Sequence, residues 1–136
     1  MIREATSADI PVIVEMARRF HEAREDRFAF NPEDTARFAA NLIASPVGVV
    51  LISERGFISG AVMGAPGNAA NLTAHELFWW AEDRQGLRLL RAFEEWARDM
   101  GCADVVVSFP AGDGVVGRIL ERGGYEPETM AVRKGL

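Results

Sequence analysis

The stretch HELFWWAEDRQGLRLLRAFEEWARDMG, residues 75–101, decides the fold. It opens with a short run of bulky apolar residues, passes through a charged turn that contains Gly86, and continues with apolar residues at helical spacing. This order predicts a strand, a tight loop and a helix over residues 87–100. The first N–H groups of a helix lack internal partners, and the helix dipole favours an anion there. The turn therefore predicts a phosphate site, and Arg84 and Arg88 add positive charge to it. Taken alone, the same pattern also fits an ordinary connection between a strand and a helix.

The rest of the chain alternates between helical and extended patterns. The pair Thr6 and Asp9 is typical of a helix cap, and Asn31 followed by Pro32 is typical of a second helix start. Further helices are therefore expected over residues 6–24, 31–45 and 115–122. Runs of β-branched and apolar residues predict strands over residues 2–5, 47–53, 57–63, 72–82 and 103–109, with one or two closing strands over residues 125–136.

The connections between these segments predict the topology. Residues 54–56 are expected to form a hairpin turn, whereas residues 64–71, with Pro66 and Gly67, are expected to form a loop. The continuously apolar segment 103–109 predicts a central strand. Helices that alternate with strands after a hairpin predict an α/β fold, in which a mixed sheet has helices on both faces.

Length and composition narrow the class of protein. The 136 residues suit one domain, and folding at that length buries roughly two-thirds of the unfolded chain's surface. The net charge of −5 argues against nucleic acid or an anionic membrane as a partner, since both need a basic surface. We expect a cytoplasmic protein, because no apolar run could span a bilayer and the acidic opening MIREATSADI lacks a signal-type segment. Cys102 is the single cysteine, which excludes an internal disulfide, and no metal site is expected.

The order of segments, with the residues they carry, resembles the GNAT superfamily of N-acetyltransferases. Residues 2–10 resemble the opening of that family, LLRAFEEWA at residues 89–97 followed by Gly101 resembles its cofactor helix, and RILERGGY at residues 118–125 resembles its last helix and Gly-Phe motif, with Tyr125 in place of phenylalanine. The resemblance covers nearly the whole chain. It implies a single GNAT-like domain over residues 1–136, with a sheet of about six or seven strands, that uses acetyl-CoA to acetylate a primary amine.

The resemblance also implies where acetyl-CoA binds. Its amide arm would lie like an added strand along backbone groups of Trp80, Ala81 and Glu82. The pyrophosphate would lie at the loop and helix start formed by Arg84, Gln85, Gly86, Leu87 and Arg88. Asp113 stands where an asparagine often contacts the pantetheine arm.

Two positions depart from the family pattern. Arg84 falls where the first glycine of the loop belongs, and the loop is shorter than usual. Either the loop is rebuilt around donors that suit phosphate, which we favour, or pyrophosphate binding is weakened. Leu120 falls where many members carry the tyrosine that protonates the CoA thiolate. The alternative function is therefore a weak or inactive GNAT-fold module that binds acyl-CoA or a protein.

Glu76 is the candidate general base. It lies early on the strand that meets the cofactor, and burial there would raise its pKa toward the range that suits a proton acceptor. A solvent-facing or ion-paired glutamate is the other interpretation. His75, whose side chain should point to the opposite face of the strand, is the weaker candidate and a candidate acceptor contact.

The acceptor is expected to be a small-molecule amine or a protein amino group. In the family, the end of the first helix borders the acceptor, so Glu22 and Glu25 could attract a cationic amine, although a solvated charged face explains them equally well. Trp79 and Trp80 should point to opposite faces of their strand, and packing is the favoured interpretation for both. Because many relatives dimerise, a homodimer is possible.

Overall fold

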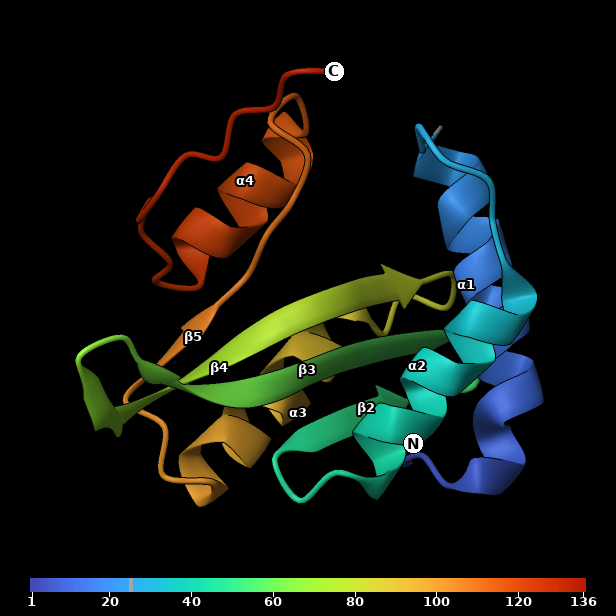
Figure 1. The fold of residues 1–136 in the computed structure, drawn as a ribbon, viewed down its shortest axis with the longest axis horizontal. Helices are drawn as coiled ribbons and strands as arrows, with labels where there is room; N and C mark the ends of the chain where they lie inside the picture. Colours follow the sequence, from blue (N-terminus) through green and yellow to red (C-terminus); the bar gives the residue numbers. More distant parts are fainter. Residues whose placement is uncertain (25) are drawn as a thin grey trace.

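The computed structural model describes residues 1–24 and 26–136 and contains a five-stranded sheet flanked by helices (Figure 1). In chain order the elements are β1 (Arg3–Glu4), a 3-10 helix η1 (Ser7–Asp9), α1 (Ile10–Arg24), α2 (Pro32–Ala44), β2 (Gly48–Ile52), β3 (Gly56–Ala65), β4 (Asn68–Ala81), α3 (Gly86–Asp99), β5 (Asp104–Val106) and α4 (Gly114–Arg122). The strands follow one another across the sheet in the order β1-β2-β3-β4-β5, and only the β4–β5 pair is parallel. The predicted α/β class with a mixed sheet is confirmed.

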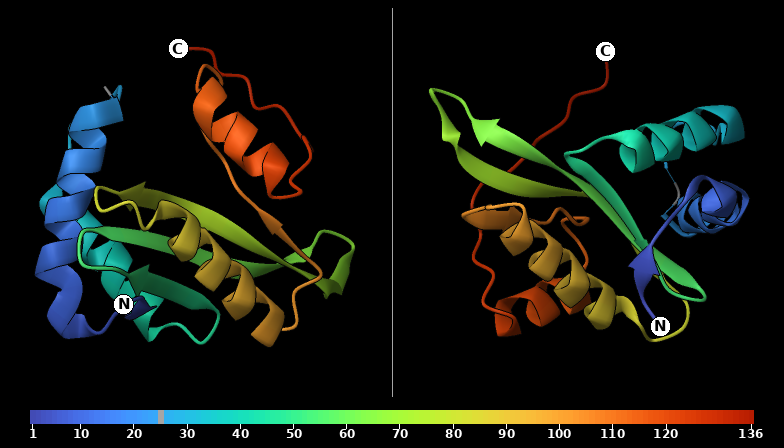
Figure 2. Two further views of the ribbon diagram at one scale, coloured as in Figure 1. Left: turned by 180° about the vertical axis from the view of Figure 1, so that it is seen from behind. Right: turned by 90° about the horizontal axis from the view of Figure 1, so that it is seen from below.

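Helices cover both faces of the sheet, as predicted. Figure 2 shows α1 and α2 on one face and α3 and α4 on the other. The caps read from the sequence are present: Thr6 N–H donates to the Asp9 carboxylate at 2.8 Å, and Asp34 N–H donates to the Asn31 side chain at 3.0 Å. These caps satisfy backbone donors that the helix ends leave free.

Each face has its own apolar core. On the α3 face the largest fully buried side chains are Ile58, Leu89 and Phe93, and Leu120 of α4 joins them. On the α1–α2 face the core includes Ile13, Met16, Ala39, Leu42 and Phe57. Trp79 packs against the first cluster and Trp80 against the second, which confirms that the two rings lie on opposite faces.

The expected loop over residues 64–71 is wrong. β3 and β4 instead form one long hairpin that continues to Ala65 and Asn68, so only Pro66 and Gly67 remain in the turn. Gly67 has a φ of 83°, a conformation that glycine adopts without steric cost. The turn chemistry was therefore correctly placed, but the polar residues after it belong to β4.

Two further expectations are wrong: a sheet of about six or seven strands, and a central strand over residues 103–109. The sheet has five strands because no closing strand forms over residues 126–136, which are exposed throughout. β5 spans only Asp104–Val106. It is the last strand in the order of the sheet and so lies at its edge. Val105 of β5 packs against the core to which α3 and α4 contribute.

A β-bulge interrupts the pairing of β3 with β4. Ser59 lies opposite Phe78 and Gly60 lies opposite Glu76, which leaves Leu77 as the extra residue on β4. Gly60 is needed at this point, because a Cβ there would lie 2.4 Å from Cζ of Phe93 and 2.5 Å from the carbonyl oxygen of His75. The bare backbone of Gly60 thus lets α3 pack against the sheet beside the bulge.

Gly60→Ala should destabilise the fold by about 1–3 kcal/mol, because the added methyl must displace both a packed ring and the backbone of β4. Gly112→Ala is the matched control, since a Cβ there meets nothing within 4 Å, and its effect should stay within about 0.5 kcal/mol. Urea denaturation of both variants measures the difference. Equal stability of the two variants would contradict the close approach at Gly60.

Candidate active site

The sheet opens at Glu76. The pairing of β4 with β5 ends at His75 and Val106, although β4 continues to Ala81. Beyond this point the two strands are bridged by a side chain, because Ser108 N–H donates to Oε2 of Glu76 at 3.2 Å. Glu76 is only 9% exposed, so its carboxylate lies in the angle between the diverging segments.

Burial changes the acidity of Glu76. It raises the pKa of the carboxyl to about 7, while the N–H of Ser108 and the positive charge of Arg24 act in the opposite direction. A carboxyl with this pKa is substantially ionised at neutral pH and still binds a proton readily. These are the properties that a general base needs near pH 7.

The loop between β4 and α3 is held by Asp83, which the sequence analysis did not single out. Its Oδ2 accepts from Oγ of Ser53 at 2.7 Å and from the N–H of Arg55 at 2.9 Å, and its Oδ1 accepts from the N–H of Gln85 at 3.2 Å. Burial opposes ionisation of Asp83, but these hydrogen bonds outweigh it and lower its pKa. An acid between the end of a strand and the start of a helix was the available signal, because Asp commonly bonds the backbone of such turns.

Arg84 lies at a left-handed backbone position, with a φ of 60°. Glycine adopts such a conformation without steric cost, and the sequence comparison with the family pattern expected a glycine at this position. A left-handed conformation costs a residue with a side chain about 1–2 kcal/mol. The conformation leaves the Arg84 side chain exposed on the loop.

The start of α3 is open to an anion. The helix begins at Gly86, its cap residue Gln85 makes no side-chain cap bond, and its first turn contains no acid. Nε1 of Trp79 donates to the carbonyl of Gly86 at 3.0 Å, which fixes the helix start against β4. Arg88 is exposed in the first turn. Free N–H groups and a nearby cation suit a phosphate.

The predicted backbone contacts for the cofactor arm differ in availability. The Trp80 ring lies 5.5 Å from that of Phe20. The Trp80 backbone belongs to the part of β4 that lies beyond the pairing with β5. Ala81 lies on the same stretch. Glu82 is otherwise engaged, since its N–H donates to the carbonyl of Arg55 at 3.0 Å and its carboxylate pairs with Arg55 and Arg19.

In the C-terminal part, the residues that the resemblance singled out make packing contacts, a hydrogen bond to α3 and a helix cap. Leu120 is 4% exposed and lies in the core on the α3 face. The hydroxyl of Tyr125 donates to Glu94 at 2.9 Å, and burial together with this acid raises its pKa. Asp113 caps α4 by accepting from the N–H of Val116 at 3.1 Å. Tyr125 therefore faces α3 and not Glu76.

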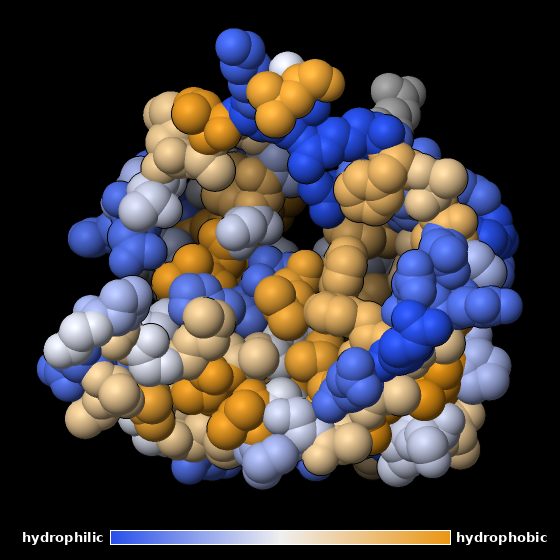
Figure 3. All heavy atoms as spheres, viewed as in Figure 1, coloured by the Kyte–Doolittle hydropathy of each residue, from blue (hydrophilic) through white to orange (hydrophobic). Residues whose placement is uncertain are grey.

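The predicted acceptor contacts are spread over two elements. His75 is half-buried and lies opposite Ala61 on the α1–α2 face. Glu22 is exposed and forms a hydrogen-bonded ion pair with Arg18 on its own helix. Glu25 lies outside the residues that the structure describes. Figure 3 shows the surface hollowed between the side that carries α4 and the side that carries α1, with hydrophobic residues along the hollow.

Two other kinds of site were sought in the described residues. Within residues 1–24 and 26–136, no three His, Cys, Asp or Glu side chains come together as metal ligands would. In the same part of the chain, none of the helices combines the length and the apolar character that crossing a membrane requires.

Comparison with known proteins finds the fold among solved structures. A structure named as a predicted acetyltransferase with acetyl-CoA, from Clostridium acetobutylicum, is 12% identical with a TM-score of 0.81, over 99% of this chain and 95% of that one. Two structures from uncultured soil metagenomic samples are named aminoglycoside acetyltransferases. One has 10% identity and a TM-score of 0.74, covering 100% of this chain and 97% of its own. The other, in complex with trehalose, has 15% identity and a TM-score of 0.76, and the match covers 100% of this chain and 95% of that one.

No protein-family profile and no curated protein sequence matches the chain. The similarity to solved structures therefore establishes the fold.

Glu76 should make stability depend on pH. Its pKa is raised in the folded protein from 4.5 to about 7, so the folded state binds the proton more tightly than the unfolded state. The resulting stabilisation, up to about 3 kcal/mol, is complete at low pH and is lost as the pH rises through about 7.

Urea denaturation between about pH 4.5 and about pH 8 should show the native protein losing this stability relative to Glu76→Gln, which keeps an oxygen to accept from Ser108. A difference between the two proteins that does not change with pH would contradict the raised pKa.

Proposed function

We propose that this chain, which has the fold of the GNAT N-acetyltransferases, transfers an acetyl group from acetyl-CoA to a primary amine within one ternary complex. The observation that carries the proposal is the buried carboxyl of Glu76 at the point where β4 and β5 diverge. A buried acid without a cationic partner in direct contact is costly to ionise, and such groups are common in catalytic sites. The start of α3 lies at the other end of the same free stretch of β4.

The residues around β4 and α3 fit acetyl-CoA. The N–H groups of Gly86, Leu87 and Arg88 at the helix start, with the side chains of Arg84 and Arg88, would hold its pyrophosphate. Backbone groups of Trp80 and Ala81 would align its amide arm along the unpaired edge of β4. Bound there, acetyl-CoA supplies an acetyl group already activated as a thioester.

Glu76 would act on the amine. An amine attacks a thioester only after it has lost its extra proton, and the Glu76 carboxylate would accept that proton, directly or through a water molecule. The backbone next to Glu76 is irregular because Leu77 is bulged. Bulges beside active sites often re-aim backbone and side-chain groups, and a backbone N–H here would be placed to polarise the thioester carbonyl.

The thiolate would leave without help from a protein acid. Leu120 lacks a proton to give, and the Tyr125 hydroxyl is bonded to Glu94. Thiols ordinarily have a pKa of about 8.5, so a departing thiolate is stable enough to leave into water near neutral pH. The same buried Leu120 favours the second candidate function, a module that binds acyl-CoA without useful turnover.

A small-molecule amine is the favoured acceptor. Two of the structural neighbours are named aminoglycoside acetyltransferases, which supports a small acceptor over a protein amino group. The hollow beside α1 is the place where such a molecule would reach Glu76 (Figure 3).

Glu76→Gln should lower kcat for amine acetylation by about 10²–10⁴-fold, because the amide cannot accept the proton. In the native protein kcat/KM should rise as the pH passes about 7 and Glu76 ionises, and the variant should lack this step. Release of CoA thiol in the presence of amines, followed from about pH 5.5 to about pH 9, measures both effects. A variant with the native pH profile would remove Glu76 from the mechanism.

Gly86→Glu should weaken acetyl-CoA binding by at least about tenfold, because it places a carboxylate where the pyrophosphate is expected. Gly86→Ala is the control: its Cβ would lie no closer than 3.7 Å to any neighbour, so it should bind within about twofold of the native protein.

Titration calorimetry with acetyl-CoA compares the two. Equal affinities would place the pyrophosphate elsewhere. Tight binding without amine-dependent thiol release would favour the non-catalytic candidate.

A further inference from the structure

Aromatic rings form a wall between α1, α2 and β4. Phe78 follows Glu76 by two residues on β4, and its ring makes edge contacts with Phe20 of α1 at 6.0 Å and with Phe38 of α2 at 5.6 Å. Phe38 and Phe78 remain 39% and 36% exposed, so part of each ring faces outward. The wall therefore offers an apolar surface of rings set edge to face, two residues along β4 from the proposed base.

A cation lies over this wall. The guanidinium carbon of Arg24, at the end of α1, lies 4.9 Å from the centroid of the Phe20 ring. Arg24 is exposed, and its charge acts on the carboxyl of Glu76. Among residues 1–24 and 26–136, no acidic side chain forms an ion pair with it. An anion bound beside Glu76 would therefore meet a partner in Arg24.

The acids of α1 are engaged within the helix or near it. Glu15 and Glu22 both bond Arg18, and Glu15 also pairs with Arg19 at 3.4 Å. A polycationic acceptor would therefore meet aromatic rings and the like charge of Arg24 before it reached Glu76. Like charges in a cleft disfavour binding, and the described wall does not suit such an acceptor.

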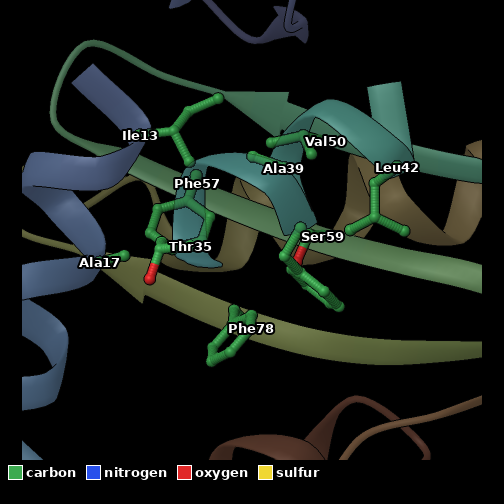
Figure 4. Close-up of a pocket in the computed structure, with 10 residues that line it drawn as sticks. Ile13, Ala17, Thr35, Ala39, Leu42, Val50, Phe57, Ser59 and Phe78 are labelled. Atoms are coloured by element: carbon green, nitrogen blue, oxygen red, sulfur yellow. The ribbon is translucent and has the colours of Figure 1, made fainter. Parts of the chain in front are cut away.

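The cavity behind Phe78 is too small to hold the body of a ligand. It lies between α1, α2 and the sheet and has a volume of about 20 Å³, which is room for about one water molecule (Figure 4). Ser59 lines it with a buried hydroxyl that has no hydrogen-bond partner in the described structure. A ligand of the site would thus rest on the exposed faces of Phe38 and Phe78 rather than behind them.

We infer that the acceptor is a free α-amino acid with an apolar or aromatic side chain. Its carboxylate would pair with Arg24, its side chain would lie against Phe78 and Phe38, and its amino group would face Glu76. An α-amino acid carries these three groups on one carbon, which matches a cation over an aromatic wall and a base whose carboxyl feels the charge of that cation. The inference rests on the proposed acetyl transfer and names the substrate class of that site.

The transfer balances without any further reactant. The amine nitrogen forms a bond to the acetyl carbon, the carbon–sulfur bond breaks, and its electron pair leaves with the thiolate. The ammonium group gives one proton to Glu76 before the attack and the nitrogen loses a second one after it; Glu76 passes the first to solvent, the second goes to Glu76 or to water, and the thiolate takes up a proton from water. The products are an N-acetyl amino acid and CoA.

The test uses the purified full chain with acetyl-CoA and four amines: L-phenylalanine, 2-phenylethylamine, L-alanine and an aminoglycoside. Thiol release should give L-phenylalanine a kcat/KM at least about tenfold above each of the others. Measured near about pH 9, where Glu76 is ionised with or without the charge of Arg24, Arg24→Gln should lower kcat/KM for L-phenylalanine by about tenfold or more, mainly through KM, and leave 2-phenylethylamine within about twofold. Arg24→Lys should restore part of the loss, since it keeps the charge.

Arg37→Gln is the matched control, because Arg37 is an exposed arginine of α2 that is already paired with Asp34. It should leave every amine unchanged. Equal losses of kcat/KM for L-phenylalanine and 2-phenylethylamine in Arg24→Gln would overturn the amino-acid acceptor but leave the proposed acetyl transfer standing. A higher kcat/KM for the aminoglycoside than for L-phenylalanine would do the same. Thiol release with none of the four amines would overturn the proposed function together with this inference.

Discussion

The close packing of Phe93 on Gly60 is the constraint on which the centre of the molecule depends. Because Gly60 has no side chain, the ring of Phe93 approaches the sheet directly beside the bulge. The bulge leaves Leu77 without a cross-strand partner, and β5 stops pairing with β4 one residue before Glu76. A carboxyl is therefore buried at the point where the sheet opens, and burial in turn raises its pKa. Packing on one face of the sheet thus sets the chemistry available at its edge.

The loop before α3 has a chain path that side-chain hydrogen bonds define. The Asp83 carboxylate collects three donors from the loop and from the β2–β3 turn, which fixes the chain path into the helix. Arg84 then takes a left-handed conformation that glycine would adopt at no steric cost. Strain of this kind persists where the surroundings determine the backbone, and it is common at ligand sites. The cation gained at Arg84 is consistent with the interpretation that the loop is rebuilt rather than lost.

Much of the fold could be predicted from local pattern. The α3 helix was expected over residues 87–100 and spans Gly86–Asp99, because its apolar stripe and its terminal glycine are properties of the sequence itself. The hairpin and the caps at Asp9 and Asn31 have the same origin. The errors lie where a strand depends on its pairing partner. The polar start of β4 is a strand because β3 lies beside it, whereas residues 126–136, for which closing strands were expected, find no partner.

For the candidate site, the sequence by itself determined the kinds of residue: an acid on β4, two arginines around a helix start, and a leucine where a tyrosine was expected. Only the tertiary structure decided their surroundings. It buried Glu76 against Ser108, gave Asp83 its three donors, and placed Arg24 over an aromatic wall built from three separate elements. The reason is physical: burial, pKa and contacts between distant segments depend on which surfaces meet, whereas helix periodicity and turn chemistry act over a few neighbouring residues.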